Sequence, residues 1–243
     1  MTNTATSTPA APTAPKGLLA RIVGIFFAPR ETFAEVAARP RVLGALSVGM
    51  IVVILALFAL FSTEAGQQAW IDQQVQGSQS FGRSLNDQQI AGMERIAPYM
   101  GYIVAGLYLV FIPIVVMVMS GILLGIFNAL LGGDATFKQV LAVVSHAGLI
   151  TVLQTLFAMP LDYFRGTLTS PTTLGVFVPF LEEKSFLSLL LGTIDLFHVW
   201  WLVTLSIGLA VLYKRRTGTI ATSLLTVYGV IILAIAAVRA ALS

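Results

Sequence analysis

The sequence of 243 residues contains no cysteine, and only 10% of its residues are Asp, Glu, Lys or Arg. The lack of cysteine excludes disulfides, thiol nucleophiles and thiolate metal sites, while it leaves the redox compartment undecided. The scarcity of charge excludes an ordinary soluble domain, in which charged residues are about a quarter of the chain.

Apolar residues dominate instead, with 57% of the sequence and a mean hydropathy of +0.89. They concentrate in five runs that are nearly free of ionisable side chains. Each run reaches the roughly 20 residues that a helix needs to cross about 30 Å of hydrocarbon. The pattern predicts an all-α integral membrane protein, a bundle of five transmembrane helices. The runs are residues 42–62, 103–127, 138–159, 187–213 and 219–242.

The basic residues outside these runs predict one orientation in the membrane. Because cytoplasmic loops carry an excess of Lys and Arg, the N-terminus is expected in the cytoplasm and the C-terminus outside. We therefore expect a multi-pass protein of the cell inner (cytoplasmic) membrane. The sequence pI near 9.4 then indicates a cytoplasmic face that is attracted to anionic lipid. It does not indicate a surface that binds nucleic acid. The basic residues on the cytoplasmic side are Lys16, Arg21, Arg30, Arg39, Arg41, Lys138, Lys214, Arg215 and Arg216.

Two N-terminal segments precede the membrane domain of residues 41–243. Residues 1–16, rich in Thr, Ala and Pro, predict a disordered cytoplasmic tail. In residues 17–40, the apolar stretch 17–28 is too short to span and is interrupted by Arg21, and an in-plane helix fits it better than a signal peptide. They predict an amphipathic helix lying in the plane of the inner leaflet. Its expected membrane-surface anchors are Lys16, Arg21, Phe26, Phe27 and Arg30.

The two long loops on the outer side differ in composition. Residues 63–99 are polar and contain Asn86 followed three residues later by Gln89, a pair that predicts a capped helix. This loop is expected to form a small helical cap on the bilayer. Residues 160–186 contain several prolines and predict an irregular connector at the interface.

Three stretches of the chain resemble a known family. Residues 26–33 (FFAPRETF), 132–141 (GGDATFKQVL) and 195–201 (DLFHVWW), the last followed by Ile207, Gly208 and Leu209, are similar to segments of the Yip (Ypt/Rab-interacting protein) domain family, bacterial type. The resemblance covers roughly residues 20–240. It implies a five-helix bundle with a cytoplasmic N-terminus. In eukaryotic relatives it also implies partnership with small GTPases in vesicle traffic, but the short N-terminal tail here offers little of their partner-binding arm.

Polar residues inside the apolar runs mark candidate functional positions, since ionisable groups in a membrane are costly. Asp195 and Arg239 are equally distant in sequence from the turn near residue 217, which predicts an ion pair at one depth. The pair either locks two helices together or serves a gate or proton site in a transporter. Otherwise each side chain reaches the interface separately. His198 shares its expected depth with Gln154, which predicts a contact between them.

Ser120 and His146 also lie equally far from a turn, the one near residue 133. A Ser and His in the bilayer suggest an intramembrane hydrolase, but Val118 replaces the expected glycine and no convergent donors beyond Asn128 suggest an oxyanion site. We therefore expect a plain interhelical hydrogen bond and no catalytic residues. The two histidines differ in depth by roughly 9 Å at about 1.5 Å per residue, which disfavours a shared metal ion. Neither a metal nor a cofactor is expected.

Small residues spaced four apart predict close helix approach, either within the bundle or in a dimer. These are Ala45 and Gly49 in the first run, Gly121 and Gly125 in the second, and Ala236 and Ala240 in the last. Pro113 predicts a kink in the second run.

Three function classes remain open from the sequence. The favoured one is a non-enzymatic membrane organiser or adaptor that acts through helix packing and partner binding. The alternative is a transporter or permease component that moves a small solute or ion past Asp195 and His198, and an intramembrane hydrolase is third. The expected partners are the lipid bilayer, anionic lipid at the cytoplasmic face, and other membrane proteins or further copies of the chain.

Overall fold

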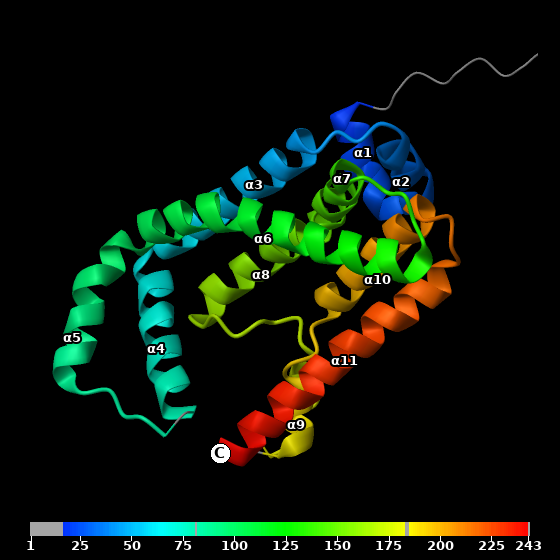
Figure 1. Cartoon of the computed structure of the whole chain (residues 1–243). Helices are drawn as coiled ribbons and strands as arrows, with labels where there is room; N and C mark the ends of the chain where they lie inside the picture. Colours follow the sequence, from blue (N-terminus) through cyan, green and yellow to red (C-terminus); the bar gives the residue numbers. More distant parts are fainter. Residues whose placement is uncertain (1–16, 81, 183–184, 243) are drawn as a thin grey trace, which may run out of the picture.

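The computed structural model describes residues 17–80, 82–182 and 185–242, and this part of the chain is helical, without named strands (Figure 1). Four helical stretches, two of which run through more than one of the elements below, are long and apolar enough to cross a membrane: Leu43–Phe61, Asp87–Ala129, Phe137–Arg165 and Thr217–Ala241. The elements are α1 (Leu18–Phe27), α2 (Pro29–Ala38), α3 (Leu43–Phe61), α4 (Glu64–Ser80), α5 (Asp87–Ile96), η1 (Ala97–Tyr99), α6 (Met100–Leu131), α7 (Phe137–Ala147), α8 (Leu149–Arg165), η2 (Leu174–Phe177), α9 (Phe186–Leu191), α10 (Leu196–Leu212) and α11 (Thr217–Leu242).

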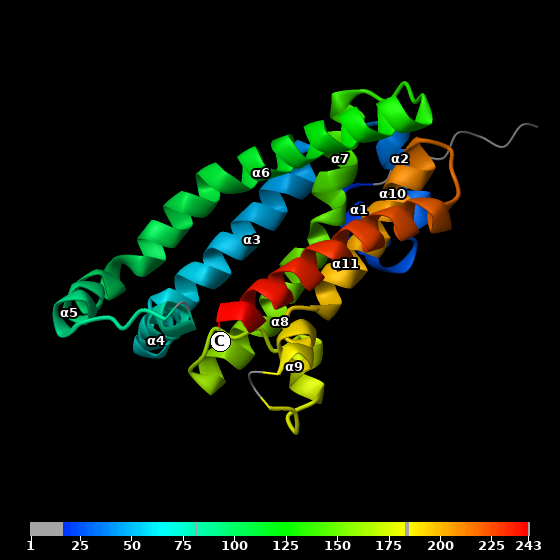
Figure 2. The same ribbon diagram turned by 60° about the horizontal axis from the view of Figure 1, so that its bottom comes forward.

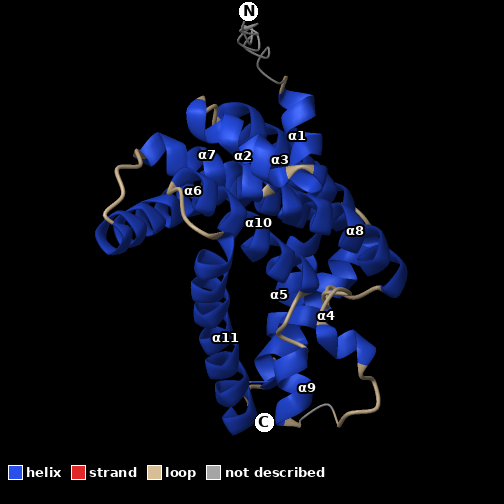
Figure 3. Ribbon diagram, turned by 90° about the vertical axis from the view of Figure 1, so that its right-hand side faces the viewer, coloured by secondary structure: helices blue, strands red, loops and turns tan. Residues whose placement is uncertain are grey.

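The buried core gathers at one end of the molecule, which we call the head. There α1, α2 and α7 meet one end each of α3, α6, α10 and α11 (Figure 1). The helix α7 is its centre, since Val140, Ala142, Val143 and Ala147 have no exposed surface. Away from the head the helices separate into two arms. The pair α3 and α6 runs side by side in one arm (Figure 2), and α11 extends in the other with α9 at its far end (Figure 3).

The third and fourth apolar runs are broken, which the sequence analysis did not predict. The third divides at Gly148 into α7 and α8. The fourth divides into the six residues of α9 and the 17 residues of α10. The break before α10 is held by backbone hydrogen bonds to the preceding connector, from Leu174 N to Ile194 O (2.8 Å) and from Leu196 N to Thr172 O (3.0 Å). Irregular backbone between apolar helices is thus hydrogen-bonded within the protein, as a membrane requires.

The segment α1–α2 is a helical hairpin that packs into the head. Pro29 occupies the first turn of α2, where its missing N–H costs nothing. The two helices approach each other so closely that a Cβ atom on Gly24 would overlap the Thr32 hydroxyl. Phe33 and Val36 of α2 are fully buried, and a Cβ on Gly208 of α10 would lie 2.9 Å from the Phe33 ring. Gly208 therefore provides the space that Phe33 occupies.

The polar segment between α3 and α6 forms the helices α4 and α5. The predicted capping pair is confirmed: Asn86 Oδ1 accepts from Gln89 N (2.8 Å), and Gln89 Oε1 accepts from Asn86 N (3.0 Å). The helix α6 is longer than the predicted run and continues through Pro113.

Candidate functional site

The most densely hydrogen-bonded polar group of the described chain is the carboxylate of Asp195. This residue is the N-cap of α10, and its Oδ1 accepts from the backbone N–H groups of Phe197 (2.8 Å) and His198 (3.3 Å). A carboxylate at this position satisfies N–H groups that a helix start leaves without partners. The signal was present in the sequence, where an Asp precedes an apolar helical run.

The second oxygen of Asp195 joins two other segments to α10. Its Oδ2 accepts from Gln154 Nε2 of α8 (2.9 Å), Ser170 Oγ (2.8 Å) and Thr172 Oγ1 (2.6 Å). With the backbone bonds this makes five donors for a residue that is only 5% exposed. The sequence analysis missed Ser170 and Thr172, because their approach depends on how the connector folds back.

His198 lies at the edge of this cluster. Its Nδ1 is 3.6 Å from Asp195 Oδ1, and about half of its side chain (49%) is exposed. His198 and Gln154 both line a pocket of about 280 Å³ between α3, α6 and α8, with Tyr108 and Ser145. His198 and Gln154, which are expected at one depth, both lie against the Asp195 carboxylate.

The predicted ion pair of Asp195 with Arg239 is not formed in the described part of the chain. Arg239 is exposed on α11, whereas Asp195 takes its hydrogen bonds from α8, α10 and the connector. Two residues equally distant from a turn are expected at the same depth, but their side chains can lie on helix faces that do not meet. The prediction was wrong for that reason.

The predicted hydrogen bond between Ser120 and His146 is likewise replaced by bonds within each helix. Ser120 Oγ donates to Val116 O (2.6 Å), and His146 Nδ1 lies 2.8 Å from Ala142 O. Both residues are fully buried, and His146 Nε2 has no partner among the described residues. Within those residues no group of three or more His, Asp and Glu side chains could hold a metal ion.

The head also buries Arg21, which the sequence analysis treated as a membrane-surface anchor. Arg21 is only 5% exposed, so its side chain lies among those of the head. The correction follows from the faces of α1. Its outer face carries Leu19, Val23 and Phe27, of which Phe27 is 85% exposed, while Arg21 and Ile25 face the bundle.

The other predicted anchors have different surroundings. Phe26 packs edge to face on Trp200 of α10, with ring centroids 6.0 Å apart, so it faces the bundle. Phe27 and Arg30 are exposed. Lys16 lies outside the described residues.

The predicted packing residues divide into two groups. Ala45 and Gly49 of α3 are buried, and a Cβ on Gly49 would lie 3.1 Å from Val152 of α8. Gly121 and Gly125 of α6 are exposed, and an added Cβ would meet no atom within 4 Å. Of these two pairs, only the one on α3 packs within the described chain. In the predicted pair on α11, Ala236 is fully buried and Ala240 is partly buried.

Residues of the three family-like stretches meet in the head, where α2, α7 and α10 pack on one another. Gly132 has a positive φ of 61°, and a Cβ on Gly133 would overlap the ring of Tyr213. Thr136 and Gln139 form a capping box at the start of α7, and Gln139 Nε2 donates to Ala37 O of α2 (3.1 Å). These residues position helices relative to one another.

The helices, their apolar faces and their internal polar bonds describe a polytopic membrane protein. The chain belongs to the Yip1 family, since the model of the Yip1 domain matches residues 23–238. Comparisons with curated proteins and with solved structures gave no match.

Proposed function

We propose that this protein is a non-enzymatic organiser or adaptor of the cell inner membrane, of the bacterial Yip type, which acts by associating laterally with other membrane helices. The observation that carries the proposal is the open surface of α6. Only 11% of its most apolar stretch is buried, compared with 50% for α7 and α8. The small residues Gly121 and Gly125 lie on that surface, and an added Cβ would meet no atom of another described element within 4 Å. Small residues allow helices in membranes to approach closely.

We further propose five membrane crossings, with α9 and α10 together as the fourth. At about 1.5 Å per residue α10 alone is roughly 25 Å long, which is short for a crossing. Both α9 and α10 pack against α11, however, and this supports a broken fourth crossing that follows α11. The excess of Lys and Arg at the head then supports a cytoplasmic N-terminus and an outer C-terminus.

The organiser role predicts that filling the small-residue face of α6 disrupts assemblies. Gly121→Leu with Gly125→Leu should lower the fraction of the protein in larger complexes, because the new side chains keep a partner helix away. The measurement is native gel electrophoresis or intermolecular energy transfer between two labelled copies. Gly106→Leu is the matched control, since Gly106 is also exposed on α6 with no neighbour within 4 Å. Unchanged complexes in the double variant would contradict the proposal.

A transporter or permease component is the second candidate, favoured by the pocket beside the half-exposed His198. This role expects Asp195→Asn to leave thermal stability unchanged and to abolish a proton or solute flux in proteoliposomes. The organiser role expects the reverse, a loss of stability, because the five donors to Asp195 indicate a structural carboxylate.

A further inference from the structure

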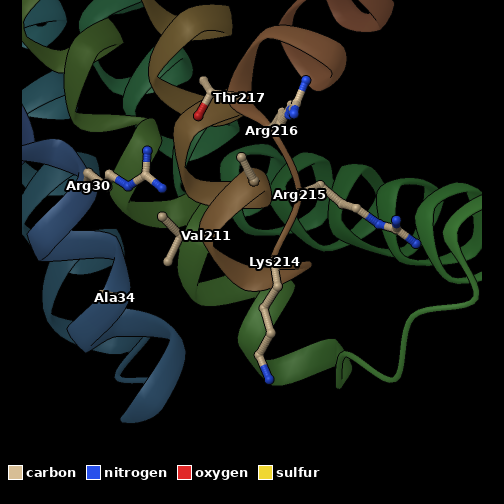
Figure 4. A pocket seen from close by; sticks show the side chains of 8 residues that line it. Arg30, Ala34, Val211, Lys214, Arg215, Arg216 and Thr217 are labelled. Carbon is tan, nitrogen blue, oxygen red and sulfur yellow. The ribbon is translucent and has the colours of Figure 1, made fainter.

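A pocket with a volume of about 730 Å³ opens between α2 and the turn that joins α10 to α11 (Figure 4). Its floor is formed by small and apolar residues, Ala34 of α2 with Ala210 and Val211 of α10. Four cations surround this floor, and no acidic residue of the described chain lines it. The basic lining residues are Arg30, Lys214, Arg215 and Arg216, and Thr217 at the start of α11 completes the wall.

The two walls of the pocket are held together by the head. Arg30 and Ala34 lie on the outer face of α2, while Phe33 and Val36 on its inner face are fully buried. Because Phe33 packs on Gly208 of α10, α2 keeps a fixed position relative to the end of α10. Figure 4 shows the Arg30 guanidinium directed into the space between α2 and the turn, whereas Lys214, Arg215 and Arg216 are directed away from Arg30.

The backbone of the turn independently indicates that the side chain of Lys214 has a function. Lys214 has a φ of 54°, a left-handed conformation that only this non-glycine residue adopts in the described chain. Arg215 N donates to Ala210 O (2.9 Å), which completes the helix-ending motif that normally places glycine at this position. A lysine here is disfavoured by roughly 1 to 2 kcal/mol. Such local strain is typical of positions where a side chain has a function.

We propose that this pocket binds a phosphoryl anion, with Arg30 on one wall and Lys214 and Arg216 on the other. Arginine forks match phosphate oxygens in bidentate geometry, and a lysine adds a point charge. The start of α11 contributes the positive end of its helix dipole. The exposed cationic side chains can turn toward the anion, while the floor and the backbone stay in place.

The phosphoryl group has two possible sources with the same chemistry. One is the headgroup of an anionic phospholipid at the membrane surface, and the other is free phosphate. The proposal goes beyond the organiser role and does not depend on it, because binding is measured on the purified full chain without partners.

The test is thermal stabilisation and binding of the full chain in neutral detergent. The probes are dioctanoyl phosphatidic acid, dioctanoyl phosphatidylcholine and inorganic phosphate. We expect phosphatidic acid to bind and phosphatidylcholine to have no effect. Binding of inorganic phosphate as well identifies a site for the free anion, and binding of phosphatidic acid alone identifies a lipid site. Both outcomes support the proposal, whereas no binding of either anion, or equal stabilisation by phosphatidylcholine, overturns it.

Variants test whether the pocket itself binds. Arg30→Gln and Arg216→Gln should each weaken phosphatidic acid binding about fivefold, in line with the attraction of one basic residue to an anionic surface. Arg83→Gln and Arg95→Gln are controls, because they remove the same charge from exposed positions outside the pocket. Equal losses in all four variants would show a diffuse charge effect and overturn the proposal.

Two further variants test the shape of the floor and the strained lysine of the turn. Ala34→Phe should block the floor and weaken binding without a change in charge, whereas Ala38→Phe, exposed one turn further along α2 but outside the lining, should not. Lys214→Gly should raise the melting temperature, because glycine accepts the left-handed conformation, and should weaken binding. Unchanged binding in both Ala34→Phe and Lys214→Gly would exclude this pocket as the site.

Discussion

Single residues show how far polar chemistry could be predicted from the sequence. Asp195 was identified as important, because a carboxylate in an apolar run is unusual. Its main partners were not identified, since Ser170 and Thr172 reach it through a connector whose path no local pattern determines. The same limit on predicting hydrogen-bond partners applies to Ser120 and His146. Their burial could be expected, but their hydrogen bonds to Val116 and Ala142 within their own helices could not be derived from depth alone.

The contacts of Asp195 predict the effect of its replacement. Asp195→Asn should reduce the free energy of unfolding by about 1 to 3 kcal/mol, because charge-assisted bonds to Gln154, Ser170 and Thr172 are weakened inside the protein. Arg239→Gln should be nearly neutral, since Arg239 is exposed. Thermal unfolding in detergent measures both. A double variant more stable than Asp195→Asn alone would show that the two residues interact after all.

At the scale of helices, composition and capping predict the bounds of a helix where an apolar run gives way to polar sequence or a capping pair is present. The bounds of α3 and α11 follow the first and last apolar runs closely, and the capping box of α5 was predicted. The breaks at Gly148 and before Asp195 were not predicted. Both lie inside apolar runs that contain no proline, so no strong helix breaker marks a boundary there.

The hairpin α1–α2 shows a related limit. Its amphipathic character was predicted, but both faces of α1 carry apolar side chains, and the pattern could not determine which one faces the bundle. The structure places Arg21 and Ile25 inward and Leu19 and Phe27 outward. The hairpin is thus held to the head by buried residues in addition to any contact with lipid.

This arrangement predicts that Phe33 fixes the hairpin. Phe33→Ala should cost about 3 to 5 kcal/mol, because it leaves a cavity beside Gly208 and Val143 in the core. Limited trypsin digestion should then cut after Arg21 and Arg30 faster than in the unchanged protein. Phe27→Ala is the matched control, because Phe27 is 85% exposed. Equal protection of the two variants from trypsin would show that the hairpin is not held by Phe33.

At the scale of the whole molecule, buried apolar packing and buried polar groups concentrate in the head, while the two arms carry long exposed apolar surfaces. Exposed side chains of α6 and α11 such as Phe111, Val118 and Val230 are typical of contact with lipid or other membrane helices. The sequence predicted the class of protein because composition alone determines it. The division into a head and two arms depends on the helix breaks, and so it could not be predicted.

The proposed fourth crossing by α9 and α10 together, with the excess of Lys and Arg at the head, implies that the head with α2 lies in the cytoplasm. Because the chain has no cysteine, single cysteines introduced at Thr169, Arg216 and Ala241 can each be labelled without background. The measurement is labelling of intact cells with a membrane-impermeant maleimide. The account predicts labelling at positions 169 and 241 and protection at 216 until the membrane is permeabilised. Labelling of 169 and 216 from the same side would contradict it.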